Sequence, residues 1–184
     1  MRFKKTQLNG AFIIEPEFLE DERGFFARVF CMTEFSKAGL TNRIAQVNNS
    51  FSRSKGTFRG LHYQLSPKSE DKLIRCIRGS IYDVIVDLNP GSATYKEHFG
   101  IELNERNRKM LFVPKNFAHG LITLEDDTEI FYLSTEFYTP NLERGIRWND
   151  PAFGINWPID PVSISEKDNN LPDFDPDHHL GLMK

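Results

Sequence analysis

The stretch Leu73-Ile-Arg-Cys-Ile-Arg-Gly-Ser-Ile-Tyr-Asp-Val-Ile-Val-Asp-Leu88 carries the clearest strand signal in the chain. In its second half one apolar face alternates with a face that carries two aspartates, and this period of two is typical of a β-strand. The apolar face comprises Tyr82, Val84, Val86 and Leu88, and the other face carries Asp83 and Asp87. The short break Arg78-Gly-Ser80 between two apolar runs predicts a pair of strands, 73–77 and 81–88, joined by a tight turn.

Further strand-like runs follow this pair at intervals of about 8 to 12 residues, a spacing that predicts an antiparallel sandwich or barrel. They cover residues 98–103, 110–113, 120–124 and 129–135. The chain contains 16 Phe, 12 Gly and 10 Pro, which suits short strands and turns rather than a helical bundle. One short helix is predicted, with Thr33 as its N-cap, Glu34 to Ala38 as its body and Gly39 as its stop.

Length and charge limit the classes to which the chain can belong. Its 184 residues predict a single domain, 1–184, over which the Pro- and Asp-rich tail from about residue 158 wraps. The net charge of −3, without a basic stripe, argues against a nucleic-acid partner. The apolar runs are far shorter than the roughly 20 residues that span a bilayer, and the N-terminus has no signal-peptide core. We therefore expect a cytoplasmic protein without a membrane partner.

Metal, disulfide and cofactor chemistry is not expected. Cys31 and Cys76 form no CxxC pair and are interpreted as small buried apolar residues. The five histidines form no HxH or HxxxH motif with an acidic third ligand. Because glycine-rich phosphate loops are also absent, any nucleotide must be held by side chains.

A cation and an imidazole lie close together in Arg59-Gly-Leu-His62. A guanidinium can bind phosphate and an imidazole can accept a proton, so both could enter one cavity. The residues alone leave open the alternative of a core histidine beside a surface arginine.

Three more polar residues lie within apolar segments, where an ionisable group is costly unless it is paired or used. Lys72 begins a strand, His119 precedes Gly120, and Tyr132 shares a strand face that could point into a barrel. Each has an open structural alternative: a surface lysine, a structural histidine and a hydrogen-bonded core tyrosine.

Taken together, these segments resemble the nucleotide-sugar 3,5-epimerase family, the dTDP-4-dehydrorhamnose 3,5-epimerase-like enzymes. The resemblance covers nearly the whole chain. It is carried by Asp21-Glu-Arg-Gly-Phe-Phe26, Arg59-Gly-Leu-His-Tyr-Gln64, Lys72-Leu73, Arg78-Gly79, Pro114, Phe117-Ala-His-Gly120, Tyr132, Glu143-Arg-Gly-Ile-Arg-Trp-Asn-Asp-Pro151 and Ile164-Ser-Glu-Lys-Asp168. It implies an all-β, cupin-type double-stranded β-helix (jelly roll) with short peripheral helices. It also implies a homodimer that exchanges N-terminal strands, and an enzyme without metal or cofactor.

The resemblance further implies a substrate and a role for each site residue. The substrate is a nucleotide-diphospho-4-keto-6-deoxyhexose of deoxysugar biosynthesis, inverted at C3 and C5. His62 is the expected base, oriented by Asp168, while Tyr132 is the expected acid across the ring and Lys72 lies near the C4 oxygen. The expected substrate-binding residues are Arg23, Arg28, Gln46, Asn48, Arg59, His119 and Tyr138. A C4 ketone acidifies the protons on C3 and C5, so an imidazole can remove one if a cation meets the enolate oxygen.

Two departures from the family pattern bear on the substrate. Arg28 stands where these enzymes commonly have Glu, and Leu133-Ser134 replace a Lys-Cys pair. Arginine offers only donors, which suits the acceptors of cytosine, so Arg28 is hypothesised to read the base and to favour CDP over dTDP. The alternatives are a C3-only epimerase or 3,4-ketoisomerase of the same fold, and a non-catalytic cupin that binds a sugar nucleotide. Because a binding module needs no acid and base, the epimerase is preferred.

Overall fold

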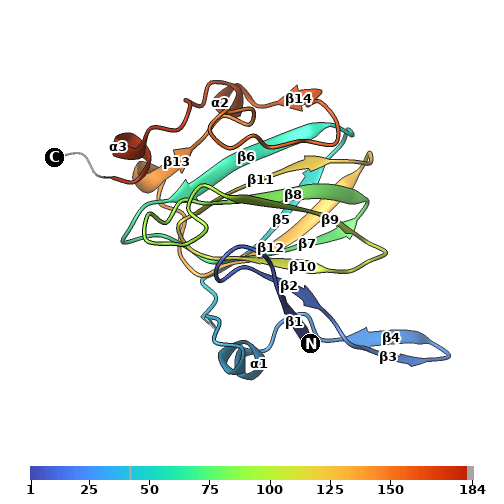
Figure 1. Cartoon of the computed structure of the whole chain (residues 1–184). Helices are drawn as coiled ribbons and strands as arrows, with labels where there is room; N and C mark the ends of the chain where they lie inside the picture. Colours follow the sequence, from blue (N-terminus) through green and yellow to red (C-terminus); the bar gives the residue numbers. More distant parts are fainter. Residues whose placement is uncertain (42, 182–184) are drawn as a thin grey trace.

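The computed structural model describes residues 1–41 and 43–181, and in this part of the chain two six-stranded sheets face each other (Figure 1). The first sheet has the order β1 (Arg2–Lys5), β2 (Phe12–Glu15), β10 (Met110–Val113), β7 (Lys72–Arg78), β12 (Thr128–Ser134), β5 (Gln46–Ser52). The second has the order β13 (Glu143–Gly145), β6 (Thr57–Gln64), β11 (Phe117–Thr123), β8 (Ser80–Asp87), β9 (His98–Asn104), with β14 (Ser163–Ile164) parallel to β6. The predicted all-β jelly roll is confirmed.

Side chains from both sheets meet in a common core. Ile74 and Cys76 of the first sheet pack with Ile85, Leu103 and other apolar residues of the second. The inner faces are therefore apolar in this part of the barrel, as expected for two sheets that bury one face against each other.

The predicted turn between residues 77 and 81 does not join paired strands, which corrects that prediction. β7 pairs with β10 and β12, whereas β8 pairs with β9 and β11. The chain passes from one sheet to the other at Gly79, whose φ is +72°, and a Cβ there would lie 2.5 Å from Oγ1 of Thr128. Glycine suits this corner because it alone adopts positive φ at little cost and leaves room for Thr128.

The period of two in β8 is confirmed, but both faces of the strand are buried. Ile85 packs inside the barrel and Val86 packs beneath the C-terminal segment. The two aspartates, Asp83 and Asp87, are consequently fully buried.

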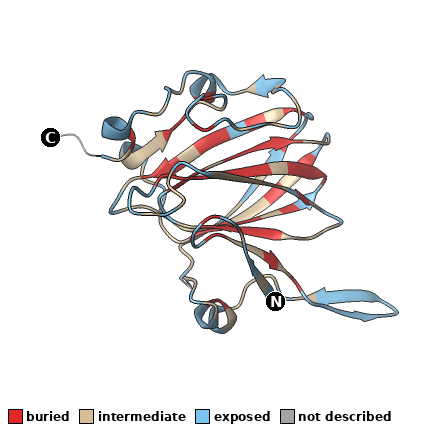
Figure 2. Ribbon diagram, in the orientation of Figure 1, coloured by how far each residue is buried: buried red, intermediate tan, exposed pale blue. Residues whose placement is uncertain are grey.

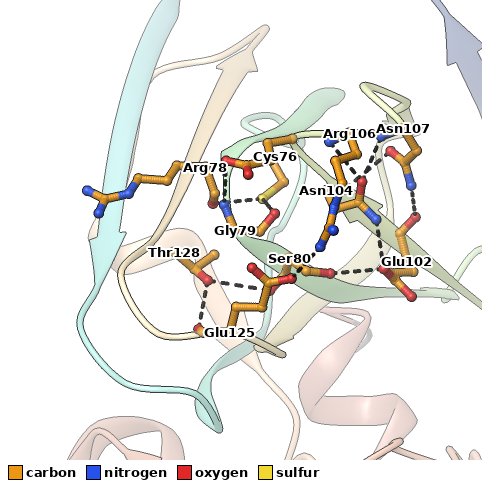
Figure 3. Close-up of polar contacts among 11 residues, drawn as sticks. Cys76, Arg78, Gly79, Ser80, Glu102, Asn104, Arg106, Asn107, Glu125 and Thr128 are labelled. Atoms are coloured by element: carbon orange, nitrogen blue, oxygen red, sulfur yellow. Dashed lines mark hydrogen bonds and ion pairs between the residues drawn. The ribbon is translucent and has the colours of Figure 1, made fainter.

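A polar network lies at the end of the barrel where β7 passes into β8 (Figure 3). The thiol of Cys76 donates to the carbonyl oxygens of Arg78 and Gly79 at 3.1 and 3.3 Å. The hydroxyl of Thr128 donates to the carbonyl oxygen of Glu125 at 2.8 Å. Burial raises the pKa of Cys76 to about 12, which agrees with a structural role for this cysteine. Cys31, in contrast, is only half-buried.

The predicted helix forms, but it starts earlier than expected. α1 spans Met32–Lys37 with Cys31 as its N-cap, and no side chain caps it, so the assignment of Thr33 is wrong. Phe35 is buried against three other phenylalanine rings, and this packing sets the helix position in place of a capping hydroxyl. Gly39, with φ of +74°, follows the last turn as predicted.

A hairpin of β3 (Phe18–Asp21) and β4 (Gly24–Ala27) projects from the barrel (Figure 1). All of its strand residues except Ala27 are exposed, as Figure 2 shows by colour. The hairpin thus presents apolar and charged side chains without burying them in its own chain.

The C-terminal segment packs along β6 and β13. After the short helix η1 (Pro140–Leu142) and β13, it contains β14, α2 (Glu166–Asn169) and α3 (Pro176–His179). The hydroxyl of Tyr63 donates to the carbonyl oxygen of His179 at 2.8 Å, and Nε2 of His179 lies 3.0 Å from the carbonyl oxygen of Gly145. Residues 182–184 of the predicted tail lie outside the described residues. No helix of the described residues is long and apolar enough to cross a membrane.

Candidate active site

A cavity of about 450 Å³ lies between the two sheets, lined by residues from both. Its wall on the first sheet comes from β5, β7 and β12, and its wall on the second sheet comes mainly from β6 and β11. The predicted site residues that line it are Gln46, Asn48, Arg59, His62, Lys72, His119, Tyr132 and Tyr138. The structure therefore brings together side chains that lie far apart in the sequence.

His62 lies on β6 and is hydrogen-bonded to Asp168 of α2. Nε2 of His62 and Oδ1 of Asp168 are 2.7 Å apart, and the amide of Gly60 donates to Oδ2 at 3.2 Å. Because a carboxylate accepts, Nε2 is the donor, and the lone pair on Nδ1 remains to take a proton. Ser165 is the N-cap of α2 and accepts from the amide of Asp168, which fixes the position of the helix.

The charge of Asp168 is stabilised despite its burial. Burial by itself raises the pKa of this carboxyl, but the hydrogen bonds from His62 and Gly60 and the charge of Lys167 outweigh burial, so the pKa is lowered. The pair thus has the arrangement of a general base with an orienting carboxylate.

A second histidine–carboxylate pair lies beside the first. His119 is directly opposite His62 in the β11–β6 register, and its Nε2 lies 2.7 Å from Oδ1 of Asp83. Asp83 is fully buried, and its Oδ2 has no hydrogen-bond partner among the described residues. Sequence reasoning did not assign Asp83 to the site, although a carboxylate inside an apolar strand was the available signal.

Lys72 and Tyr132 occupy the wall formed by the first sheet. The Lys72 side chain is only 16% exposed and its Nζ lies 2.9 Å from Oε1 of Glu70, so the surface-lysine alternative is wrong. Burial, and after it the charge of Glu70, raise the pKa of Tyr132, while Arg59 opposes this effect. The Tyr132 hydroxyl is therefore protonated at neutral pH and can act as an acid. Sequence reasoning missed Glu70 because it precedes β7 and shares no strand periodicity.

The rim of the cavity carries further charges. Lys167 and the hydroxyl of Tyr138 both donate to Oε2 of Glu143, at 2.5 and 2.9 Å. Burial by itself raises the pKa of Glu143, but these two donors, together with nearby positive charge, outweigh burial, so the net shift is downward. The guanidinium of Arg59 is held by Ser52, whose Oγ lies 3.2 Å from Nε. Glu143 falls within a segment that carried the family resemblance, yet no role was assigned to it.

Arg23 and Arg28 do not line the cavity of their own chain. Arg23 is 83% exposed at the tip of the hairpin and pairs with Asp21 at 2.6 Å. Nη1 of Arg28 donates to Oε1 of Glu34 at 3.1 Å. The projecting hairpin keeps the first of these arginines away from the barrel, and the second is turned toward α1.

The grouped side chains include a base, an acid and a cation. In the described part of the chain, no three His, Cys, Asp or Glu side chains gather in a way that could hold a metal ion. Proton transfer next to a polarised carbonyl is the chemistry that such a set can perform.

Comparisons with known proteins agree on one family. The sequence family of dTDP-4-dehydrorhamnose 3,5-epimerase matches residues 5–176. A dTDP-4-dehydrorhamnose 3,5-epimerase from Methanothermobacter thermautotrophicus is 48% identical over 172 residues, which cover 92% of each chain.

Solved structures extend this agreement to three dimensions. A dTDP-6-deoxy-D-glucose-3,5-epimerase from Legionella pneumophila, in complex with dTDP-4-keto-L-rhamnose, has a TM-score of 0.88 at 37% identity, covering 94% of this chain and 92% of that chain. A 3'-monoepimerase from Streptomyces bikiniensis, in complex with dTDP-quinovose, has a TM-score of 0.88 at 30% identity, covering 97% of this chain and 91% of that chain.

The prediction of a nucleotide-sugar epimerase with a cupin-type fold is confirmed by the extent of these matches. They span more than nine-tenths of the chain and include the segments that line the cavity. The chain belongs to the dTDP-4-dehydrorhamnose 3,5-epimerase family.

Proposed function

We propose that the chain inverts C3 and C5 of a dTDP-linked 4-keto-6-deoxyhexose, with His62 as base and Tyr132 as acid. One observation carries the proposal: the two side chains line the same cavity from opposite sheets, His62 from β6 and Tyr132 from β12. Inversion at carbon requires that a proton leave one face and return to the other. A base and an acid on opposite walls achieve this while the sugar stays in place.

In this mechanism the C4 ketone makes the neighbouring C–H groups acidic. Nδ1 of His62 removes the proton, and Asp168 stabilises the imidazolium that forms. Negative charge develops on the C4 oxygen, where the ammonium of Lys72 stabilises it. Tyr132 then donates its proton to the opposite face of the carbon. The imidazolium of His62 releases its proton to solvent and the tyrosinate takes one up, so both groups are restored before the second carbon reacts.

Substrate binding is proposed to follow the charge of the cavity. Arg59 binds the diphosphate, since a guanidinium recognises phosphate oxygens in a bidentate manner. The remaining cavity side chains that contact sugar or nucleotide are Gln46, Asn48, His119 and Tyr138. We place dTDP before CDP because the Legionella and Streptomyces structures hold dTDP-linked ligands. The hypothesis that Arg28 favours CDP remains a prediction. In its own chain the Arg28 guanidinium pairs with Glu34.

We also propose a homodimer in which the β3–β4 hairpin of each chain reaches the cavity of the other. Leu19 and Phe26 of the hairpin are 69% and 62% exposed, and edge strand β5 exposes Val47 and Phe51. Exposed apolar side chains on a projecting hairpin and on an open strand edge are typical of a surface that a second copy covers. The exchange would carry Arg23 to a cavity that it cannot reach in its own chain.

The experiment that tests the function uses dTDP- and CDP-4-keto-6-deoxyglucose in D2O, with deuterium at C3 and C5 read by NMR. Exchange at both carbons, faster with the dTDP form, is the expected result. Exchange at C3 alone would instead make the chain a monoepimerase, as the Streptomyces bikiniensis relative is described. Absence of exchange with either nucleotide would contradict catalysis and favour a binding module.

A further inference from the structure

We propose that Glu70 is a positioning residue, which holds the ammonium of Lys72 at the place where the C4 oxygen of the substrate binds. This inference rests on the function proposed above for Lys72 and Tyr132. Glu70 is absent from the residues that the family resemblance implied. The inference follows from the contacts of its buried carboxylate.

The first contact is the ion pair with Lys72. Oε1 of Glu70 lies 2.9 Å from Nζ of Lys72, and the Glu70 side chain is only 7% exposed. Both residues line the cavity. A lysine side chain has several rotatable bonds and reaches many positions unless a partner fixes its end. Glu70 supplies such a partner inside the cavity rather than on the protein surface.

The second contact fixes Glu70 itself. Its Oε2 accepts a hydrogen bond from Nε2 of Gln64, the last residue of Arg59-Gly-Leu-His-Tyr-Gln64. Gln64 is anchored in turn, because Nε2 also donates to the carbonyl oxygen of Lys68 at 2.9 Å, and Oε1 accepts from the amide of Thr139 at 2.5 Å. The chain of contacts therefore runs from the strand that carries His62, through Glu70, to Lys72.

The same carboxylate acts on the proposed acid. Tyr132 lies directly opposite Ile74 in the β12–β7 register, two residues from Lys72. Burial is the largest cause that raises the pKa of Tyr132, and the negative charge of Glu70 is the second largest. The other titratable or charged side chains that line the cavity are Arg59, His62, Tyr63, Lys72, His119, Glu136, Tyr138 and Glu143. Of these, Arg59 acts on Tyr132 and lowers its pKa, in the direction opposite to Glu70.

The test is the substitution Glu70→Gln, assayed with dTDP-4-keto-6-deoxyglucose. Loss of the ion pair releases Nζ of Lys72, so kcat should fall about 10- to 100-fold, the size of effect that a misplaced catalytic group produces. KM should change much less, because the diphosphate contacts stay in place. The pKa of Tyr132 should decrease, measured as the ultraviolet absorbance of tyrosinate against pH, with the same titration of Tyr132→Phe subtracted.

A matched control breaks another glutamate–cation pair outside the cavity. Glu125→Gln removes the contact between Glu125 and Arg106, which are 3.1 Å apart (Figure 3). This variant should leave kcat and the Tyr132 titration unchanged. Because tyrosinate absorbance requires no turnover, the titration reports on Glu70 even if the proposed reaction is wrong.

Two further variants keep the proposal falsifiable. In a Lys72→Met background, Glu70→Gln should lower deuterium exchange little further, since the two residues act as one unit. Glu70→Asp keeps the negative charge but shortens the side chain, so kcat should fall while the Tyr132 titration stays nearly as in the wild type. If Glu70→Gln does not fold, Glu70→Asp provides the test in its place. Wild-type kcat in both Glu70 variants, with a strongly reduced but measurable kcat in Lys72→Met, would overturn the positioning role. An inactive wild type or an active Lys72→Met would instead contradict the proposed function.

Discussion

His62 and His119 each bind a buried carboxylate through Nε2, yet the two pairs are built differently. Asp83 lies on β8, within the same sheet as both histidines, whereas Asp168 comes from the C-terminal segment. Each carboxylate selects the tautomer in which Nδ1 can accept a proton. The site thus contains two imidazoles that are each oriented by an aspartate, and we assign the role of general base to His62.

The separation of base and acid can be tested by substitution. His62→Ala should abolish deuterium exchange at both C3 and C5, a loss of about 10²- to 10⁴-fold. Tyr132→Phe should retain part of the exchange but lose inversion, because abstraction and reprotonation occur on opposite faces. Both are measured by NMR in D2O with the dTDP-linked substrate. Exchange at C3 at a near-normal rate in His62→Ala would assign the base elsewhere, with His119 the next candidate.

The lowered pKa of Asp168 also predicts how stability depends on pH. The folded-state pKa lies below the ordinary value of 3.8, so the folded protein binds fewer protons than the unfolded chain near that pH. This contribution to the free energy of unfolding is complete above pH 3.8 and is lost as pH falls through the lowered pKa. The difference in Tm between wild type and Asp168→Asn should therefore be largest at neutral pH and shrink below about pH 4. A constant difference across this range would contradict the assignment of charge.

Among the secondary-structure elements, the strands built from apolar runs were predicted best. β7 to β12 were found close to their observed bounds because each is a short apolar run that ends at turn residues, and in β8 a period of two adds to this signal. β5 was missed because its pattern is reversed: Gln46 and Asn48 line the cavity while Val47 and Phe51 are exposed. A strand that turns polar side chains inward to bind a substrate does not look like a strand that buries an apolar face.

Pairing between strands was not predictable from local sequence. The connection through Gly79 resembles a hairpin turn, but it crosses between sheets because β10 and β12 flank β7 and leave no free edge. The carboxylate partners of the two histidines were also difficult to predict. Asp168 was implied by the family resemblance alone, and Asp83 was not predicted as a partner of His119. Contacts across 106 and 36 positions are set by topology rather than by spacing.

The proposed exchange of hairpins between two chains predicts complementation between inactive chains. Co-expression of His62→Ala and Arg23→Glu chains should produce mixed dimers in which one cavity has an intact base and an intact hairpin. Random pairing gives about a quarter of wild-type activity in the unfractionated mixture and about half in purified mixed dimers, whereas each variant alone is nearly inactive. The activities of the mixture and of the purified mixed dimers are the measurements. If Arg23 acted within its own chain, no mixture would recover activity.

At the scale of the whole molecule, the two sheets and the C-terminal segment together supply the base, acid, cation and orienting carboxylate of the proposed reaction. The base comes from one sheet, the acid and the cation from the other, and the orienting carboxylate from the segment that covers β6. Length, strand spacing and composition predicted the class of fold, and the family resemblance predicted the cavity. The positions of Arg23 and Arg28 outside the cavity of their own chain could not be predicted from the sequence, since they depend on where the hairpin and the residues after it lie.

Because side chains fulfil each role, we expect activity to be independent of metal. Exhaustive dialysis against EDTA should leave kcat/KM for the dTDP-linked substrate unchanged, since the ammonium of Lys72 stabilises the enolate oxygen in place of a Lewis acid. A loss of activity that one divalent cation restores would contradict this expectation.

The position of Asp168 on the C-terminal segment has a consequence for protein synthesis. Translation adds about 5 to 20 residues per second from the N-terminus, and all barrel strands through β13 precede Asp168. A nascent chain whose sheets have paired therefore carries His62 without its carboxylate and Gly60 without the acceptor for its amide. Asp168 can reach both groups only after it leaves the ribosomal exit tunnel. Catalytic competence thus arises only after residue 168 has been synthesised and has left the tunnel, so a chain released before that point carries His62 without the carboxylate that orients it.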